Sequence, residues 1–356
     1  MKTLKKVLVV VMIMALVLQI FGCASAPEVT NPTETKKPNT EAPIENNDPG
    51  EDNKGAVAVV FATGGLGDKT YNDSLYNGVK AVCEELDLKF DYSEPMDAAE
   101  YEPLLRGYAE TGIYDLIISL GYSQGSSVEA VASNFPDQNF MLIDAEIDVD
   151  NVACYSWREN ELSYMAGVMG AYMTKTKVLG FIAAFDIYNC NMNAAGLTAG
   201  AQSVDPEIKV LIDYVGSWDD ISGCKEMAIA MHEQGADIIY HAASTGGLGI
   251  LEAGMEKGFF TVGWDGNVNP DAPDTNFASE IRLFPVAAEK AITAAINGDF
   301  EGGVVSLGAS DDAIEIVNEG SNVKIPDEVW DAINAAKAGI TDGSIVVPKT
   351  LDELNG

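Results

Sequence analysis

The sequence has few basic residues and few residues of the kinds that bind soft metals. It holds 21 Lys and Arg against 55 Asp and Glu, so its formal net charge is −34. This excludes a broad nucleic-acid-binding surface, because affinity for the phosphate backbone comes mainly from Lys and Arg. The two histidines, His232 and His241, and the five cysteines show no CxxC or HxxxH spacing. Nothing therefore predicts a structural zinc site, and we expect no metal or other cofactor.

Four of the cysteines lie well inside the chain, at Cys83, Cys154, Cys190 and Cys224. Four cysteines allow three disulfide pairings, and their spacing does not choose among them. Free cysteine is also among the most buried residue types. We therefore expect four small buried side chains, with disulfide pairing as the alternative.

The N-terminus lacks an apolar run long enough for an ordinary transmembrane helix. Three lysines precede a run from Val7 to Leu18, which has the length of a signal-peptide core. The run is followed by Ile20-Phe21-Gly22-Cys23, which resembles the bacterial lipobox. We expect residues 1–22 to be a cleaved lipoprotein signal peptide, and Cys23 to carry the lipid that anchors the mature protein to the membrane. An uncleaved anchor, or cleavage elsewhere, is the alternative.

Residues 23–54 are rich in Pro, Thr, Asn and Glu and have almost no large apolar side chain. Such a segment cannot bury enough surface to offset the entropy lost on ordering. We expect a disordered tether, with the folded part beginning near Gly55. Removing residues 1–22 takes away three lysines and no acid, which makes the net charge about −37. The acidic excess thus belongs to the exported protein.

From Gly55 onward, short β-branched runs alternate with longer segments of helical period, and the same order restarts at Val178. This alternation predicts βαβ units and parallel sheets in two similar halves. The halves align where DLIISLGYSQG, from Asp115, corresponds to DIIYHAASTGG, from Asp237. Each of these segments is followed by a helical segment and another strand that ends in an acid.

The acids at the ends of those strands are Asp144 and Asp265, and Asp68 follows the first strand of the folded part. In an open α/β sheet the ligand crevice lies beyond the carboxyl ends of the strands. We therefore expect all three to face one cleft between the halves. For each acid taken alone, the alternative is a helix cap or a turn residue.

Two motifs have the form of enzyme motifs, but their surroundings argue against catalysis. GYSQG, at residues 121–125, fits the nucleophile elbow of serine hydrolases, but no histidine follows late in the chain as that mechanism needs. GGLGDKT, at residues 64–70, joins a strand to a helix as a phosphate loop does, but Asp68 stands where the glycine should directly precede Lys. An acid there would repel a phosphate, so we expect an uncharged or cationic ligand and no enzyme.

Aromatic residues recur where predicted strands run into turns. They are Tyr71, Tyr122, Trp157, Phe185, Trp218 and Trp264. Some of them are expected to be core residues, but a large ring at such a place can also stack on a flat ligand. Acids for hydroxyl groups, together with aromatic rings, indicate a site for a sugar or a nucleoside.

Several longer segments resemble the basic membrane protein family of ABC-transporter substrate-binding lipoproteins, some of whose members bind nucleosides. The resemblance extends from about Gly55 to Ile316. It rests on GLGDKTYNDSLYNG, NFMLID, LSYMAGVMGAYMTKTKVLGFIAA, YVGSWDD, EMAIAMHEQGADIIYHAASTGG and VGWDGN.

This resemblance implies an α/β protein with the type I periplasmic-binding-protein fold, in which two Rossmann-like lobes with parallel sheets are joined by a hinge and close on a ligand. The first lobe would comprise residues 55–158 and about 278–303. The second would comprise residues 159–277 and about 304–345. The implied protein is a monomer, anchored by lipid to the extracytoplasmic face of the bacterial cell membrane, that delivers a nucleoside, a purine nucleoside above all, to an ABC permease.

By position, the resemblance places three residues of the first lobe against the ligand: Asp68, Tyr71 and Asn72. It also implies that Asp144 receives donors from the base and Asp265 bridges ribose hydroxyls, with Phe185 and Trp218 near the plane of the base. Arg282 stands where the family commonly has Lys, and is expected to pair with Asp265 or a ribose oxygen.

The chain departs from the family pattern after FDI, where it reads YNCNMN. Asn191, Met192 and Asn193 replace a basic pair and an aromatic residue in a loop that the resemblance places against the ligand. The ligand can therefore differ from the common purine nucleosides. A pentose or hexose receptor, a nucleoside hydrolase that uses the paired acids, and a sensory or adhesive surface protein are the alternatives.

Overall fold

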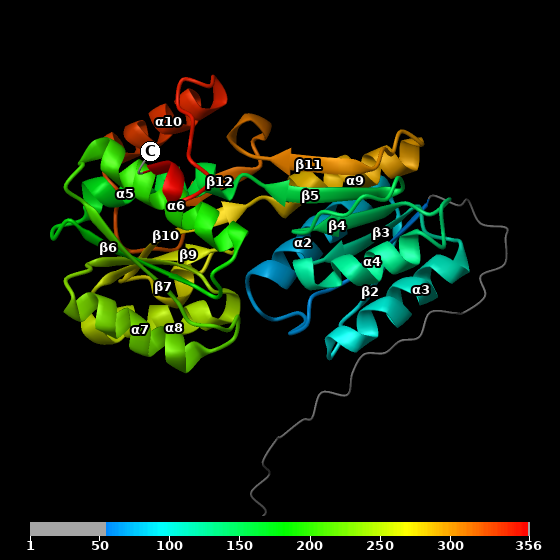
Figure 1. Ribbon diagram of the computed structural model, residues 1–356, viewed down its shortest axis with the longest axis horizontal. Coiled ribbons are helices and arrows are strands. Elements are labelled where there is room, and N and C mark those ends of the chain that lie inside the picture. The colour runs from blue at the N-terminus through cyan, green and yellow to red at the C-terminus, as the bar shows by residue number, and fades with distance from the viewer. Residues whose placement is uncertain (1–54, 355–356) are drawn as a thin grey trace, which may run out of the picture. The chain divides into compact units, whose positions relative to one another are not determined.

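The computed structural model describes residues 55–354 (Figure 1). The expected signal peptide, the lipidation site at Cys23 and the tether lie outside these residues. Two six-stranded sheets carry the described part of the chain, one in each lobe. The structure confirms the α/β class and the two-lobed organisation expected from the sequence.

The first sheet is wholly parallel, in the order β11-β5-β4-β3-β1-β2. Its strands are β1 (Ala56–Val60), β2 (Lys89–Ser93), β3 (Leu116–Leu120), β4 (Phe140–Ile143), β5 (Val152–Trp157) and β11 (Gly303–Leu307). Its helices are α2 (Tyr71–Leu86), α3 (Tyr101–Thr111), α4 (Gly125–Ala132) and α9 (Phe284–Asn297). Val57 and Val59 of β1 share a core with α2 and α9, whereas Ala58 and Val60 share one with α3 and α4. Helices on both faces explain why β1 and β4 are apolar at every position.

The second sheet has the order β12-β10-β9-β8-β6-β7, and only β12 runs antiparallel to its neighbour. Its strands are β6 (Val178–Ala183), β7 (Lys209–Tyr214), β8 (Ile238–Ala242), β9 (Phe260–Trp264), β10 (Asn276–Arg282) and β12 (Ile314–Val317). Its helices are α5 (Glu159–Met173), α6 (Tyr188–Val204), α7 (Ile221–Glu233), α8 (Gly247–Lys257) and α10 (Asp327–Thr341). The order of strands repeats that of the first sheet, as the internal sequence repeat predicts.

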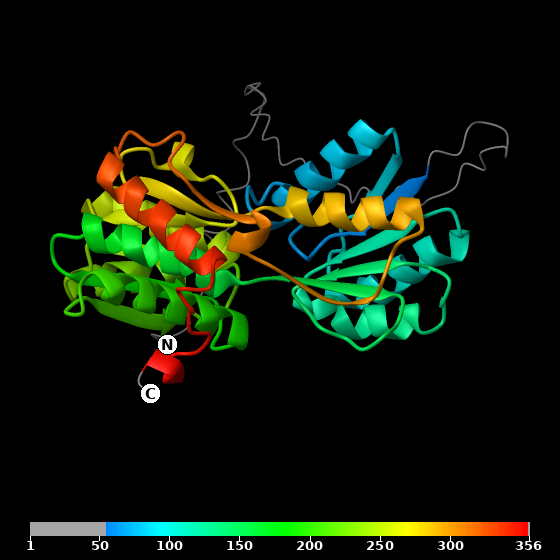
Figure 2. The same ribbon diagram turned by 90° about the horizontal axis from the view of Figure 1, so that it is seen from above.

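The chain passes between the two sheets three times (Figure 2): after β5, after β10 and after β11. The sequence expectation gave residues 278–303 to the first lobe and 304–345 to the second. In the structure, β10 stays in the second sheet as far as Arg282, and β11 carries the first-lobe segment on to Leu307. Short 3-10 turns complete the described elements: η1 (Ala98–Glu100), η2 (Tyr122–Gln124), η3 (Ser244–Gly246), η4 (Asn269–Asp271), η5 (Ala309–Asp311) and η6 (Asp352–Leu354).

Helices α5 and α6 approach each other closely because glycines line their contact. A Cβ atom on Gly167 would lie 2.2 Å from the carbonyl oxygen of Leu197, and one on Gly196 would lie 2.2 Å from that of Asn160. No side chain fits at either position. This close packing brings the first turn of α5 against the N-terminal half of α6, where a buried polar group of residues forms.

The two halves fill the equivalent turn after the third strand of each sheet in different ways. In the first lobe, Ser119 donates to Gln124, whose amide bonds the carbonyl oxygens of Val60, Phe61 and Leu120. In the second lobe the aligned residues are His241 and Gly246. There the imidazole occupies the space, and a Cβ on the adjacent Gly247 would lie 2.1 Å from its Cε1. The first lobe therefore fills this space with Gln124 of the turn, and the second lobe fills it with His241 of the strand.

Candidate ligand-binding site

Arg282, the last residue of β10, lies at the centre of a buried cluster of charges. Its side chain is 4% exposed. The guanidinium donates from Nε and Nη2 to the two carboxylate oxygens of Asp265, both at 2.6 Å. Nη1 donates to Asp144 at 2.9 and 3.1 Å and to Glu159 at 2.9 Å. Paired bonds of this kind are strong and fix the plane of the guanidinium.

The acids of the cluster come from both lobes. Asp144 follows β4 of the first sheet, Asp265 follows β9 of the second, and Glu159 begins α5 of the second lobe. Asp144 and Asp265 occupy equivalent positions of the repeat and share a left-handed backbone, with φ of 64° and 60°. Aspartate tolerates this conformation better than most residues, which allows a sharp turn directly after each strand. Each carboxylate is thereby turned toward the same cation.

Aromatic rings surround the guanidinium. Its central carbon lies 5.3–5.6 Å from the ring centroids of Tyr71, Trp157, Trp264 and Phe284, within the range of cation–π attraction. The Tyr71 hydroxyl also donates to Asp144 Oδ2 at 2.6 Å. The Trp157 indole N–H bonds the carbonyl oxygen of Ala313. Trp157 is therefore a core residue whose ring also forms one wall of the cluster.

Burial shifts the titration of these groups. Desolvation raises the pKa of Glu159 to about 8 against the attraction of Arg282, and the neighbouring Asp144 and Asp265 raise it further. Burial likewise raises the pKa of Asp265, which Arg282 opposes. For Arg282, burial acts to lower the pKa, but the three carboxylates outweigh it and hold the guanidinium charged. The pKa of Tyr71 is raised by burial and then by Asp144.

Asp68 and Asn72 are close in sequence to Tyr71 of this cluster, but their side chains form hydrogen bonds within the loop between β1 and α2 and the first turn of that helix. The Asp68 carboxylate accepts from the backbone N–H groups of Thr70, Asn72 and Asp73 and from the Asn72 amide. Asn72 Oδ1 accepts from the N–H of Ala62. In this structure Asp68 thus plays the turn-stabilising role that was the alternative for each acid.

The other predicted aromatic residues lie apart from the guanidinium. Phe185 and Trp218 contact each other edge to face, with their centroids 5.6 Å apart, and both are partly exposed. Tyr122, on η2, is 53% exposed. The structure therefore brings together six of the residues singled out from the sequence: Tyr71, Asp144, Trp157, Trp264, Asp265 and Arg282.

Residues 191–193 do not form the ligand-facing loop that the sequence indicated. They belong to α6, which begins at Tyr188. Asn193 is 1% exposed, and its amide donates to Glu159 Oε2 at 2.5 Å. Met192 is also buried, while Asn191 bonds Asp186 and Tyr214. The resemblance implied a loop at these residues, whereas the structure has a helix. Asn193 is buried in this helix because Glu159 accepts a hydrogen bond from its amide.

Sequence reasoning missed Glu159 and a second buried acid, Glu280. Glu280 lies on β10 two residues before Arg282, is 3% exposed, and contacts the Ser163 hydroxyl at 2.9 Å. Burial raises its pKa to about 8. The available signal was the alternation along β10, which places residues 280 and 282 on the same side of the strand.

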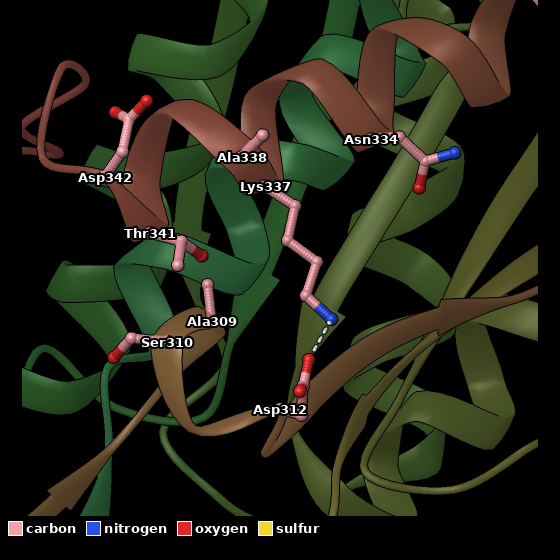
Figure 3. Close-up of a pocket in the computed structure, with 8 residues that line it drawn as sticks. All are labelled: Ala309, Ser310, Asp312, Asn334, Lys337, Ala338, Thr341 and Asp342. Carbon is pink, nitrogen blue, oxygen red and sulfur yellow. Dashed lines mark hydrogen bonds and ion pairs between the residues drawn. The ribbon is translucent and has the colours of Figure 1, made fainter.

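A hollow of about 480 Å³ lies elsewhere on the second lobe, between α10 and η5 (Figure 3). It is lined by Ala309, Ser310, Asp312, Asn334, Lys337, Ala338, Thr341 and Asp342. Lys337 Nζ bonds Asp312 Oδ1 at 2.9 Å across it. No residue of the Arg282 cluster lines this hollow, so the two are separate features.

Within residues 55–354, no three His, Cys, Asp or Glu side chains are grouped so as to hold a metal ion. Over the same span, no helix has the length and apolar character needed to cross a membrane. Cys83, Cys154, Cys190 and Cys224 are all free and buried, which confirms the expectation of four small buried side chains.

Comparisons with known proteins agree with this architecture. Residues 56–350 match the family model described as Bmp, ABC transporter substrate-binding protein PnrA-like. A CD4+ T-cell-stimulating antigen of Listeria monocytogenes is 29% identical, over 82% of this chain and 88% of the relative. The ABC transporter nucleoside-binding protein BmpA of Lactococcus lactis is also 29% identical, with the same coverage.

Among solved structures, a solute-binding protein of an ABC transporter system from Aeropyrum pernix superposes with a TM-score of 0.73 at 26% identity. The match covers 85% of this chain and 95% of that protein. The two lobes and their connections thus follow the fold of ABC solute-binding proteins, as the sequence resemblance implied.

Proposed function

Because the chain belongs to the Bmp family of PnrA-like ABC transporter substrate-binding proteins, we propose that it captures a nucleoside, a purine nucleoside above all, between its two lobes. It delivers this ligand to the permease of an ABC importer. The chain acts as a monomer on the extracytoplasmic face of the cell membrane, anchored by lipid at Cys23. The observation that carries the proposal is the cluster in which Arg282 joins Asp144 of the first lobe to Asp265 and Glu159 of the second.

The chemistry of the cluster suits a ligand that is uncharged and rich in hydrogen-bond donors. Each carboxylate can accept two hydroxyl or amide hydrogens, and bonds to a charged acceptor contribute roughly 1.5–3 kcal/mol each. A vicinal diol offers two such donors at the spacing of one carboxylate. The rings of Tyr71 and Trp264 lie 5.4 and 5.6 Å from the central carbon of the guanidinium that these acids hold, and they offer flat apolar surfaces to a base.

A nucleotide does not suit this site. The only cation of the cluster, Arg282, is already bonded to three carboxylates. A phosphate would add negative charge where acids outnumber cations, and its desolvation would have no compensating partner. We therefore expect discrimination against the phosphorylated ligand by at least tenfold, which corresponds to about 1.4 kcal/mol.

The test is a thermal-shift and calorimetric comparison of adenosine, adenosine monophosphate and ribose on the purified protein. Saturating ligand stabilises the folded state by about 2.7 kcal/mol at a hundredfold excess over Kd. We expect a shift with adenosine and little or none with the monophosphate or ribose. Equal binding of the monophosphate would refute the proposal. Tighter binding of ribose would favour the sugar-receptor alternative, and release of free base on long incubation would indicate a hydrolase.

Variants locate the binding site. Asp265→Asn keeps the shape of the side chain but removes an acceptor charge, and should weaken adenosine binding at least tenfold. Asp312→Asn is the matched control. Asp312 is exposed, lines the separate hollow, and its carboxylate pairs with Lys337 there. If both variants bind adenosine as the wild type does, the ligand does not contact the cluster.

A further inference from the structure

A chain of buried polar side chains connects Glu280 to Arg282 through two helices of the second lobe. Glu280 Oε2 lies 2.9 Å from Ser163 Oγ, and Ser163 Oγ lies 2.9 Å from Asn193 Oδ1. Asn193 Nδ2 lies 2.5 Å from Glu159 Oε2, and Glu159 Oε1 accepts from Arg282 Nη1. Ser163, Asn193, Glu159 and Glu280 are each at most 4% exposed. Buried polar atoms are seldom left without a hydrogen-bond partner, so we expect each contact in this chain to hold a hydrogen.

The orientation of the Asn193 amide follows from its neighbours. Its nitrogen faces two acceptors, Glu159 Oε2 and the carbonyl oxygen of Asn189 at 3.0 Å. Turning the amide over would set its oxygen against that carbonyl, where no hydrogen is available. Both N–H groups are thus used, and Asn193 Oδ1 is left to accept from Ser163.

Ser163 then has one hydrogen fewer than its two contacts require. A serine hydroxyl carries one hydrogen, yet Ser163 Oγ is within hydrogen-bond distance of two oxygens, Asn193 Oδ1 and Glu280 Oε2. If Ser163 donates to Asn193, the contact with Glu280 is satisfied only when the carboxyl group itself donates. Glu159 cannot supply that hydrogen, because both of its oxygens already accept from N–H groups.

We propose that Glu280 is a protonated carboxylic acid at neutral pH, and that its hydrogen bond through Ser163 and Asn193 holds Glu159 in position against Arg282. All bonds of the chain then run in one direction, from Glu280 to the carboxylate of Glu159. Glu280 is a positioning residue for the proposed ligand site, and it acts without touching the ligand. The protonation of Glu280 follows from the hydrogen bonds alone, whereas its effect on the ligand rests on the proposed function.

The charged surroundings of Glu280 agree with a neutral carboxyl group. Burial is the largest cause of its raised pKa, the Ser163 hydrogen bond lowers the pKa, and Glu159 on α5 and Asp265 after β9 raise it. Tyr240 on β8 is a titratable neighbour, whose pKa is raised mainly by burial and further by Glu280. On the paired strand β12, Ile316 lies opposite Glu280, and the acid Glu315 is one register position away and exposed. Burial raises the pKa of both Glu159 and Glu280 to about 8, and the hydrogen bonds decide that the proton lies on Glu280.

Ionisation of Glu280 would break this order. A carboxylate at position 280 would draw the Ser163 hydrogen to itself, and Asn193 Oδ1 would lose its donor. If only the protonated form is competent, a group with a pKa of about 8 makes the Kd for adenosine roughly tenfold weaker at pH 9 than at pH 7. Adenosine suits as the probe because its base does not change charge in this range.

The first experiment needs no ligand. Infrared spectra of the full chain should show the carbonyl band of a protonated carboxylic acid at pH 7, and this band should fade toward pH 9. Glu280→Gln should lack the band, whereas the matched control Glu315→Gln, exposed on the neighbouring strand, should keep it. A band that persists in Glu280→Gln, or a wild type without it, overturns the proposal, whatever the protein binds.

The second experiment measures adenosine affinity against pH. The wild type and Glu315→Gln should show the roughly tenfold weakening, and Glu280→Gln should remove the pH dependence, because its amide donates to Ser163 at every pH. Glu280→Leu, which cannot donate, should bind weakly throughout. The same slope in Glu280→Gln as in the wild type overturns the positioning role. Absence of adenosine binding in every variant would instead count against the proposed ligand, and the infrared result would still decide the protonation.

Discussion

Replacing Arg282 by methionine should destabilise the protein strongly, because it leaves three buried carboxylates without a cation. The guanidinium makes five hydrogen bonds to Asp144, Asp265 and Glu159. Removing one partner of a buried ion pair typically costs about 3–5 kcal/mol. With an unfolding entropy of about 2 cal/mol/K per residue over the roughly 300 described residues, this lowers the melting temperature by about 5–8 °C.

The measurement is thermal unfolding followed by circular dichroism at pH 8 and at pH 5. The matched control is Arg106→Met, because Arg106 is 35% exposed and its bond to Glu102 on the same helix is a surface pair, which contributes about 1 kcal/mol or less. The loss caused by Arg282→Met should be smaller at pH 5, since protonation relieves carboxylates that have lost their cation. If Arg282→Met costs no more than Arg106→Met at pH 8, or if its cost grows in acid, the charge argument is wrong.

Two further predictions concern buried groups outside the cluster. Burial lowers the pKa of His241 to about 4, so the folded state favours the neutral imidazole. The contribution of His241 to the free energy of unfolding should therefore be highest above pH 6.5 and fall as the pH drops toward 4, by up to about 3 kcal/mol. Both ring nitrogens lack a partner, so His241→Leu should remove this acid sensitivity without loss at pH 7; unchanged sensitivity in denaturant titrations would contradict this. Burial covers the thiols of Cys83, Cys154, Cys190 and Cys224 and raises their pKa, to about 11 for three of them. These thiols should therefore react with a thiol reagent only after unfolding. Rapid reaction of the native protein would show that they are accessible.

The sequence predicted the fold and the acids at strand ends because both follow from local patterns. The alternation of strands and helices shows the βαβ units directly. The repeat then places Asp144 and Asp265 at equivalent turns, and parallel strands carry their carboxyl ends to one edge. The left-handed backbone at both aspartates is a local feature that the sequence pattern did not show.

The missed residues depend on packing between segments that are far apart in the chain. Glu159 reads as an ordinary acid in the first turn of a helix, and Glu280 as one acid in a strand of mixed character. Only the packing of α5 against β10 brings Glu159 to Arg282 and Glu280 to Ser163. Asp68, a conspicuous acid in a glycine-rich loop, bonds its own backbone here, and its contact with a ligand stays a prediction.

The threefold passage of the chain between the sheets also constrains the order in which the lobes can form during synthesis. The first sheet ends in β11, which pairs with β5 although about 145 residues separate them. A chain that emerges from its N-terminus cannot complete the first sheet until β11 has followed five of the six strands of the second sheet. The second sheet is in turn completed by β12, which follows β11 in the chain. The two lobes therefore complete their sheets one directly after the other, and neither forms as an independent early domain.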